Sequence, residues 1–205
     1  MYRRLLGLLA LSSLAIAPAN ASAYGRMQPD ATTKATYAAA SSFTAPAATT
    51  TDFWQIYGSG TKTIKVLRVE AAYVGEWNYS GSDKFFLIKR STANSGGTST
   101  TVTNVPLDSA NSAGTATVKI YTDNPSSLGT SVGQVSSGLI NNTIWNGAGS
   151  LPISSQSSTT LFDHKLTGQP IVLRGTGEGL CLNFNSVKPT ATTPLIAITV
   201  TWTEE

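Results

Sequence analysis

The sequence contains few charged residues and almost none of the side chains that bind metals. Of its 205 residues, 12% are charged, about half of the roughly 25% usual in soluble proteins, and the chain has one histidine and one cysteine. A single cysteine excludes an internal disulfide and a cysteine-based zinc site, and a single histidine excludes a multi-histidine metal site. We therefore expect neither a metal nor an organic cofactor.

The charges that are present do not gather into a basic surface. The chain has 14 Lys and Arg residues against 11 Asp and Glu residues. Two of the basic residues, Arg3 and Arg4, belong to an apolar N-terminal segment, and without them the balance is 12 to 11. Because the remaining charges occur singly or in pairs, no stripe of cations follows a phosphate backbone, and we do not expect nucleic-acid binding.

The first 23 residues have the pattern of a secretory signal peptide. In Met1–Ala23, two arginines precede the apolar run Leu5–Ala17, and small residues then offer cleavage after Ala21 or Ala23. The run is too short for a stable membrane span. The alternative is an apolar N-terminal helix that stays attached. Cleavage implies a secreted, extracellular protein.

The next segment, residues 24–51, is rich in alanine and threonine. It has no helical stripe and no long alternation of polar and apolar residues. We predict an extended arm or linker, which either packs on a neighbouring subunit or remains a flexible terminus.

From residue 52 to residue 205, short apolar runs alternate with clusters of Gly, Ser, Asn and Pro. No helical periodicity is present, and β-branched threonine suits a pleated sheet. The pattern predicts an all-β fold, an antiparallel β-sandwich of jelly-roll type. The predicted strands are Asp52–Tyr57, Thr63–Val74, Lys84–Arg90, Thr101–Leu107, Ala116–Thr122, Val132–Ile140, Thr159–Phe162, Pro170–Arg174, Leu180–Asn185 and Leu195–Thr203.

Alternation within these segments identifies core residues. In the last strand every second residue is large and apolar, which marks a sheet with one buried face. The same alternation of apolar and other residues occurs around Leu182. In the second predicted strand the phase slips between Val66 and Leu67, which predicts a β-bulge there or burial on both faces. The expected core residues include Ile196, Ile198, Val200, Trp202, Leu182 and Phe184.

Three motifs contain residue types that occur in catalytic sites, but none is specific for such a site. Asp163 and His164 form the only His–acid neighbours, but 29 Thr and 24 Ser residues would place a hydroxyl near any histidine by chance. Glu70 and Glu76 do not form an evident carboxylate pair across a cleft. The segment Gly175–Gly179 lacks the Lys-Ser/Thr ending of a phosphate loop and is predicted to be a hairpin turn. We expect no catalytic residues and no enzyme activity.

Aromatic residues in polar loops are the candidate contact residues. Trp77 and Tyr79 lie between glycines and serines, and Trp145 lies in an asparagine-rich segment. Such side chains either stack on sugar rings and anchor protein interfaces, or fold back to cap the sandwich. The lone Cys181 is predicted to be buried and unreactive.

A further set of segments is spread over most of the chain after residue 23: Gly25–Met27, Pro29–Ala31, Leu87–Ser99, Ile171–Thr176 and Val200–Glu205. These segments resemble small Thr-rich β-sandwich proteins of tailed-phage and prophage structural modules. The resemblance implies a virion-associated, decoration- or fibre-like protein, located in the virion if Met1–Ala23 is not a signal peptide. Such proteins assemble in the cytoplasm, so this implication competes with the predicted signal peptide.

Two functions of different classes follow. The first is a non-enzymatic structural protein that binds further copies of itself, as a homo-oligomer, or virion components. The second is a secreted carbohydrate-binding module that holds a glycan through loop aromatics. An exported hydrolase is a distant third.

Overall fold

The computed structural model describes residues 34–46, 51–76, 81–142, 154–184 and 195–205. The chain divides into two units, Met1–Asp30 and Ala31–Glu205, and all described residues belong to the second unit. The predicted signal peptide, Met1–Ala23, therefore lies outside the described residues.

The described residues form twelve strands and one helical turn, α1 (His164–Thr167), which Asp163 caps by accepting a hydrogen bond from the Lys165 amide. The strands are β1 (Thr36–Ala40), β2 (Thr51–Tyr57), β3 (Ile64–Glu76), β4 (Gly81–Arg90), β5 (Ser99–Val102), β6 (Val105–Pro106), β7 (Thr117–Tyr121), β8 (Ser131–Asn142), β9 (Ser154–Asp163), β10 (Ile171–Leu173), β11 (Gly179–Phe184) and β12 (Leu195–Glu204).

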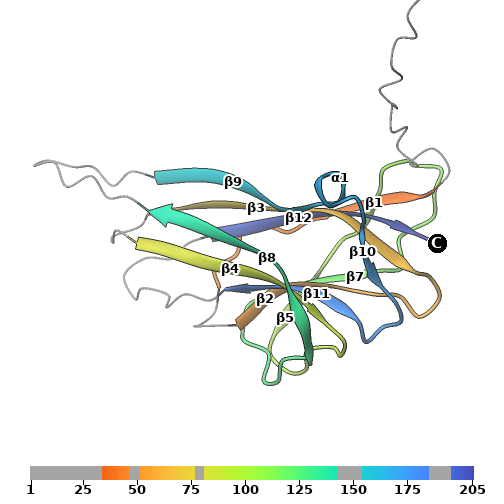
Figure 1. Cartoon of the computed structure of the whole chain (residues 1–205), viewed down its shortest axis with the longest axis horizontal. Coiled ribbons are helices and arrows are strands. Elements are labelled where there is room, and N and C mark those ends of the chain that lie inside the picture. The colour runs from red at the N-terminus through yellow and green to blue at the C-terminus, as the bar shows by residue number, and fades with distance from the viewer. Residues whose placement is uncertain (1–33, 47–50, 77–80, 143–153, 185–194) are drawn as a thin grey trace, which may run out of the picture. The chain divides into compact units, whose positions relative to one another are not determined.

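The strands build two six-stranded antiparallel sheets that pack against each other (Figure 1). Sheet A has the order β10-β3-β12-β1-β6. Strand β9 also pairs with β3: β10 pairs with the start of β3, up to Val66, and β9 pairs with the rest, from Arg68 onward. Sheet B has the order β5-β7-β2-β11-β4-β8. The predicted antiparallel β-sandwich is confirmed.

The core lies between the sheets and is supplied mainly by alternate residues of the central strands. In β12, Ile196, Ile198, Val200 and Trp202 are fully buried, whereas Thr199 on the other face is exposed. Leu182 and Phe184 of β11 are also fully buried, so all six predicted core residues are confirmed. Complete burial of an aliphatic or phenyl side chain contributes about 1.5–3 kcal/mol. Further large core residues are Trp54, Tyr37, Phe53, Phe85, Ile56, Ile64, Leu87, Leu173 and Leu180.

The predicted bulge in β3 is present. Thr201 pairs with Arg68 and Trp202 pairs with Val66, so Leu67 is the extra residue opposite β12. The extra residue shifts the alternation by one, and both Val66 and Val69 face the core.

The predicted arm requires a correction. Residues 36–40 do not form part of an arm outside the sandwich; they form β1, which pairs along its whole length with β12 and also with β6. Tyr37 is 1% exposed, and its ring stacks on that of Trp202 at a centroid distance of 5.8 Å. Burial of this aromatic side chain fixes the segment to sheet A, although its flanking alanines gave little strand signal.

Two connections also differ from the prediction. The predicted strand Thr101–Leu107 is two strands, β5 in sheet B and β6 in sheet A, because the chain crosses between the sheets near Asn104. Pro106 has no amide hydrogen, and it lies in the short edge strand β6. The turn over Gly175–Gly179 joins β10 of sheet A to β11 of sheet B, so it is not a hairpin.

Candidate functional site

A cluster of buried polar side chains lies on the outer face of sheet B, opposite the core. Alternation places it there: Trp54 and Ile56 of β2 face the core, and Gln55 faces the other side. Gln55 pairs in register with Cys181 of β11. The loops after β4 and β7 cover these residues and are joined to each other by the Ser95–Ser127 bridge. We call this set the polar cluster: Asp52, Gln55, Arg90, Asn94, Tyr121, Cys181 and Asn183, each less than 10% exposed.

Asp52 is the centre of the polar cluster. Arg90 donates from Nε to Asp52 Oδ2 at 2.5 Å and from Nη2 to Oδ1 at 2.8 Å. The side-chain amides of Asn94 and Asn183 each donate to the carboxylate at 2.9 Å. Burial alone would raise the pKa of Asp52, but these hydrogen bonds outweigh it and lower the pKa. Four donors occupy the carboxylate, so its ionised form is favoured and no lone pair is left for a ligand.

The polar cluster also fixes the two covering loops. Arg90 Nη1 donates to the Gly129 carbonyl at 2.6 Å, and the Gly129 amide donates to Asn94 Oδ1 at 2.7 Å. A β-carbon on Gly129 would lie 1.8 Å from the Thr92 carbonyl oxygen, so only glycine fits there. These hydrogen bonds hold the two loops against sheet B, which is a structural role.

Cys181 completes the polar cluster. Its thiol donates to Gln55 Oε1 at 3.7 Å and is 1% exposed. Burial raises the pKa of the Cys181 thiol well above its ordinary value. The predicted burial of Cys181 is confirmed, and a protonated, covered thiol is a poor nucleophile.

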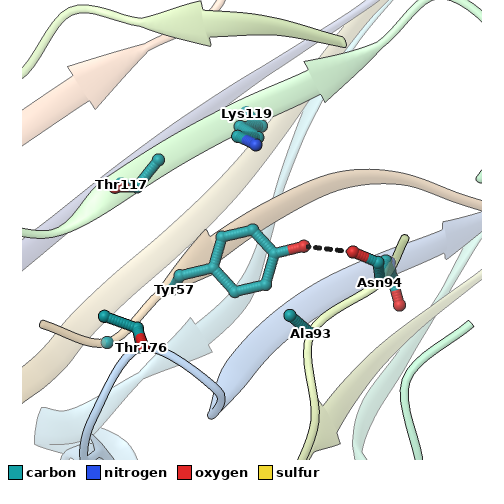
Figure 2. Close-up of a pocket in the computed structure, with 7 residues that line it drawn as sticks. Tyr57, Ala93, Asn94, Thr117, Lys119 and Thr176 are labelled. Atoms are coloured by element: carbon teal, nitrogen blue, oxygen red, sulfur yellow. Dashed lines mark hydrogen bonds between the residues drawn. The ribbon is translucent and has the colours of Figure 1, made fainter. Parts of the chain in front are cut away.

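A pocket of about 230 Å³ lies beside the polar cluster (Figure 2). The Tyr57 hydroxyl donates to the Asn94 carbonyl at 3.5 Å, and burial raises the pKa of Tyr57. Lys119 Nζ lies 5.9 Å from the centre of the Tyr57 ring. Because this ring is only 7% exposed, it offers little surface on which a sugar could stack. The pocket also includes Gly58, Ala93, Thr117 and Thr176.

A second buried carboxylate fixes the C-terminal strand. Glu204 accepts hydrogen bonds from the Thr115 amide at 2.7 Å and from Trp202 Nε1 at 3.0 Å, and it is 5% exposed. Burial would raise the pKa of Glu204, but the donors from Trp202, Ala116 and Thr115 lower it. Like Asp52, Glu204 is a fully engaged structural group.

Described residues of the motifs considered for catalysis make structural contacts. His164 Nδ1 lies 3.1 Å from the Leu67 carbonyl oxygen and 3.8 Å from Asp163 Oδ1, which caps α1. No side-chain hydroxyl bonds to the His164 ring among the described residues. Glu70 is paired with Arg68 at 2.6 Å. Within the same part of the chain, no three His, Cys, Asp or Glu residues converge on a metal-sized site.

The predicted contact residues Trp77, Tyr79 and Trp145 lie outside the described residues. Their role as contact residues therefore stays a prediction.

The exposed edge strand β8 is a feature that the sequence reasoning missed. In the described part of the chain, β8 forms a ladder of backbone hydrogen bonds only with β4. Further along β8, Ser136 Oγ donates to the Leu161 carbonyl of β9 at 2.6 Å. Its valines Val132 and Val135 are 62% and 38% exposed. The sequence signal was available: residues 124–162 contain no Asp, Glu, Lys or Arg, whereas the chain average of 12% predicts about five charges over that length.

Comparisons with profiles of protein families, with curated proteins and with solved structures found no match to this chain. None of the helical structure in the described ranges is long and apolar enough to cross a membrane.

Proposed function

We propose that the protein is a non-enzymatic structural protein that acts by assembling with other protein copies, as a decoration- or fibre-like component of a phage virion. The observation that carries the proposal is the exposed, charge-free segment Ser131–Val135 of β8, an edge strand of sheet B. Sheet edges present unpaired backbone groups that another chain can extend, and soluble proteins commonly protect them with charged side chains.

The hydrogen bonding and burial of the buried polar groups support the non-enzymatic part of the proposal. Asp52 and Glu204 each accept several hydrogen bonds, and Cys181 is covered and protonated. Catalytic acids, bases and nucleophiles need access to a substrate, and these groups have none. The virion setting rests on the resemblance to phage structural proteins.

Mass spectrometry of virions purified from the native source tests the proposal. We expect peptides of this chain at a constant ratio to the major capsid protein across gradient fractions. Recovery of the protein only as free material, with none in the virion fractions, would contradict the proposal.

A glycan array separates this function from carbohydrate binding. The assembly function predicts no array signal. A signal that is lost in Trp77→Ala and Tyr79→Ala would favour the carbohydrate-binding module instead.

A further inference from the structure

We propose that the pocket beside Tyr57 is a binding site for a single carboxylate group, with Lys119 as the cation that recognises it. The carboxylate belongs either to an acidic side chain of a partner protein or to a free organic acid. The first source rests on the assembly function above, whereas the chemistry of the pocket does not depend on it.

The first argument is that Lys119 is a half-buried cation without an anion. It is the charged residue among those that line the pocket, and its Nζ lies over the Tyr57 ring, which carries no formal charge. Within the described ranges, no carboxylate forms an ion pair with Lys119. Other lysines with partly buried side chains do have such a partner, since Lys65 and Lys89 each pair with a glutamate at 2.7 and 3.4 Å.

The second argument is that two carboxylates of neighbouring elements are already compensated. Glu178 lies in the loop that lines one side of the pocket, but its Oε2 accepts a hydrogen bond from the Arg174 amide at 2.9 Å and pairs with Lys89 Nζ at 3.4 Å. Asp52, in the polar cluster, is held by its four donors. The charge of Lys119 is therefore left for an anion that enters the pocket.

The third argument is that the walls of the pocket are preformed. Asn94 is fixed by its hydrogen bonds to Asp52 at 2.9 Å and to the Gly129 amide at 2.7 Å. The Tyr57 hydroxyl donates to the Asn94 carbonyl, and the Gly58 amide is bonded to the loop before β11 at 2.9 Å. A pocket whose walls are already ordered loses less conformational entropy when a ligand binds. The polar cluster thus gives the pocket its rigidity.

Two hydroxyl groups complete the set of donors. Thr117 lies two residues from Lys119 on the outer face of β7, and Thr176 lies in the loop between β10 and β11; both line the pocket (Figure 2). Neither hydroxyl makes a hydrogen bond to another residue in the described part of the chain. Both are therefore available to donate to a carboxylate oxygen beside the ammonium group.

Size and charge favour a carboxylate over other anions. The pocket volume of about 230 Å³ equals that of about seven water molecules at roughly 30 Å³ each, so a group with a few carbon atoms fits. A phosphate group carries more than one negative charge at pH 7, and proteins commonly bind it with arginine clusters or helix N-termini. The residues that line this pocket supply one cation and belong to strands and loops. One ammonium group matches the single charge of a carboxylate.

NMR titration of the full chain at constant ionic strength tests the site. The probes are propionate, N-acetyl-glutamate methylamide and the neutral N-acetyl-glutamine methylamide. We expect the glutamate probe to shift the amide signals of Thr117, Lys119 and Thr176 with a dissociation constant of roughly 1–10 mM, because one partly exposed ion pair contributes little. The glutamine probe should bind at least fivefold more weakly, because it lacks the charge.

Substitutions of Lys119 assign the binding to this side chain. Lys119→Met removes the charge and should weaken binding of the glutamate probe at least fivefold, whereas Lys119→Arg keeps the charge and should retain binding. The matched control is Lys165→Met, because Lys165 is exposed in α1 and does not line the pocket; it should leave the affinity unchanged. Thermal unfolding checks that each variant is folded. Thr117→Val, which removes one hydroxyl donor, is a second test and should weaken binding at least twofold.

The outcomes separate the two sources and separate this inference from the proposed function. Tighter binding of the glutamate probe than of propionate assigns the site to a partner's side chain, and equal or tighter binding of propionate assigns it to a free acid. Equal binding of the glutamate and glutamine probes, an unchanged affinity in Lys119→Met, or tighter binding of inorganic phosphate than of propionate overturns the carboxylate site. Presence of the chain in purified virions would then still support the assembly function, and absence from virions would leave a measured carboxylate site intact.

Discussion

Asp52 and Arg90 form an ion pair that is almost completely buried, with exposures of 0% and 5%. Such a pair does not stabilise a fold simply by its charges, because both groups lose their hydration. Its effect lies in the two loops that Arg90 and Asn94 attach to sheet B through Gly129. Loss of one partner leaves the other charge buried without compensation.

We predict that Asp52→Ala lowers the free energy of unfolding by about 3–5 kcal/mol. The matched control is Glu70→Ala, which breaks the Arg68–Glu70 pair at a partly exposed site and should cost about 1 kcal/mol or less. Urea denaturation of both variants measures the difference. Equal effects of the two substitutions would contradict the structural role given to Asp52.

At the scale of elements, β1 shows how a short segment becomes essential to a sheet. It occupies the position between β12 and β6, and its pairing with β12 covers Trp202 with Tyr37. Removal of residues 24–51 would therefore remove part of the core and not merely an arm.

We predict that Tyr37→Ala destabilises the protein by about 3–5 kcal/mol, because a buried ring is replaced by a cavity. Phe43→Ala is the control, since this ring is 47% exposed and lies just beyond β1, and it should cost less than about 1 kcal/mol. The comparison is made by thermal or urea unfolding. A stable protein after Tyr37→Ala would argue against β1 as a part of the folded sandwich.

At the scale of the whole molecule, two buried carboxylates link stability to pH. The pKa values of Asp52 and Glu204 are lowered in the folded protein, so the unfolded chain binds protons at a higher pH than the folded chain does. The stability that they contribute is therefore complete above about pH 5 and is lost as the pH falls through their folded pKa values, below about pH 4.

We expect the free energy of unfolding to fall as the pH drops below about 4. Glu204→Gln should flatten this fall, because its side chain no longer titrates. Urea unfolding at a series of pH values measures the slope. An unchanged slope in Glu204→Gln would show that this carboxyl does not contribute to acid sensitivity.

Processing is a further property of the whole molecule. If Met1–Ala23 is a signal peptide, protein from its native source should begin at residue 22 or 24. Intact-mass measurement decides this, and a chain that still begins at Met1 would contradict it.

The sequence by itself determined most of the strands, the core face of β12 and the bulge at Leu67. Side chains of a strand point to alternate faces of the sheet, so the local alternation of polar and apolar residues shows which of them are buried. The buried state of Cys181 followed from the same alternation. The neutrality of residues 124–162 was also present in the sequence, but only the pairing order placed β8 at an exposed edge.

The tertiary structure alone decided the membership of β1 and the existence of the polar cluster. In β1 only Tyr37 carries a large apolar side chain, so local patterning is weak until β12 provides a partner. Asp52 lies 38 residues from Arg90 and 131 from Asn183 in the chain. No local period connects residues so far apart; they meet because β4, β11 and β2 are neighbours in sheet B, and hydrogen bonding across strands depends on that order.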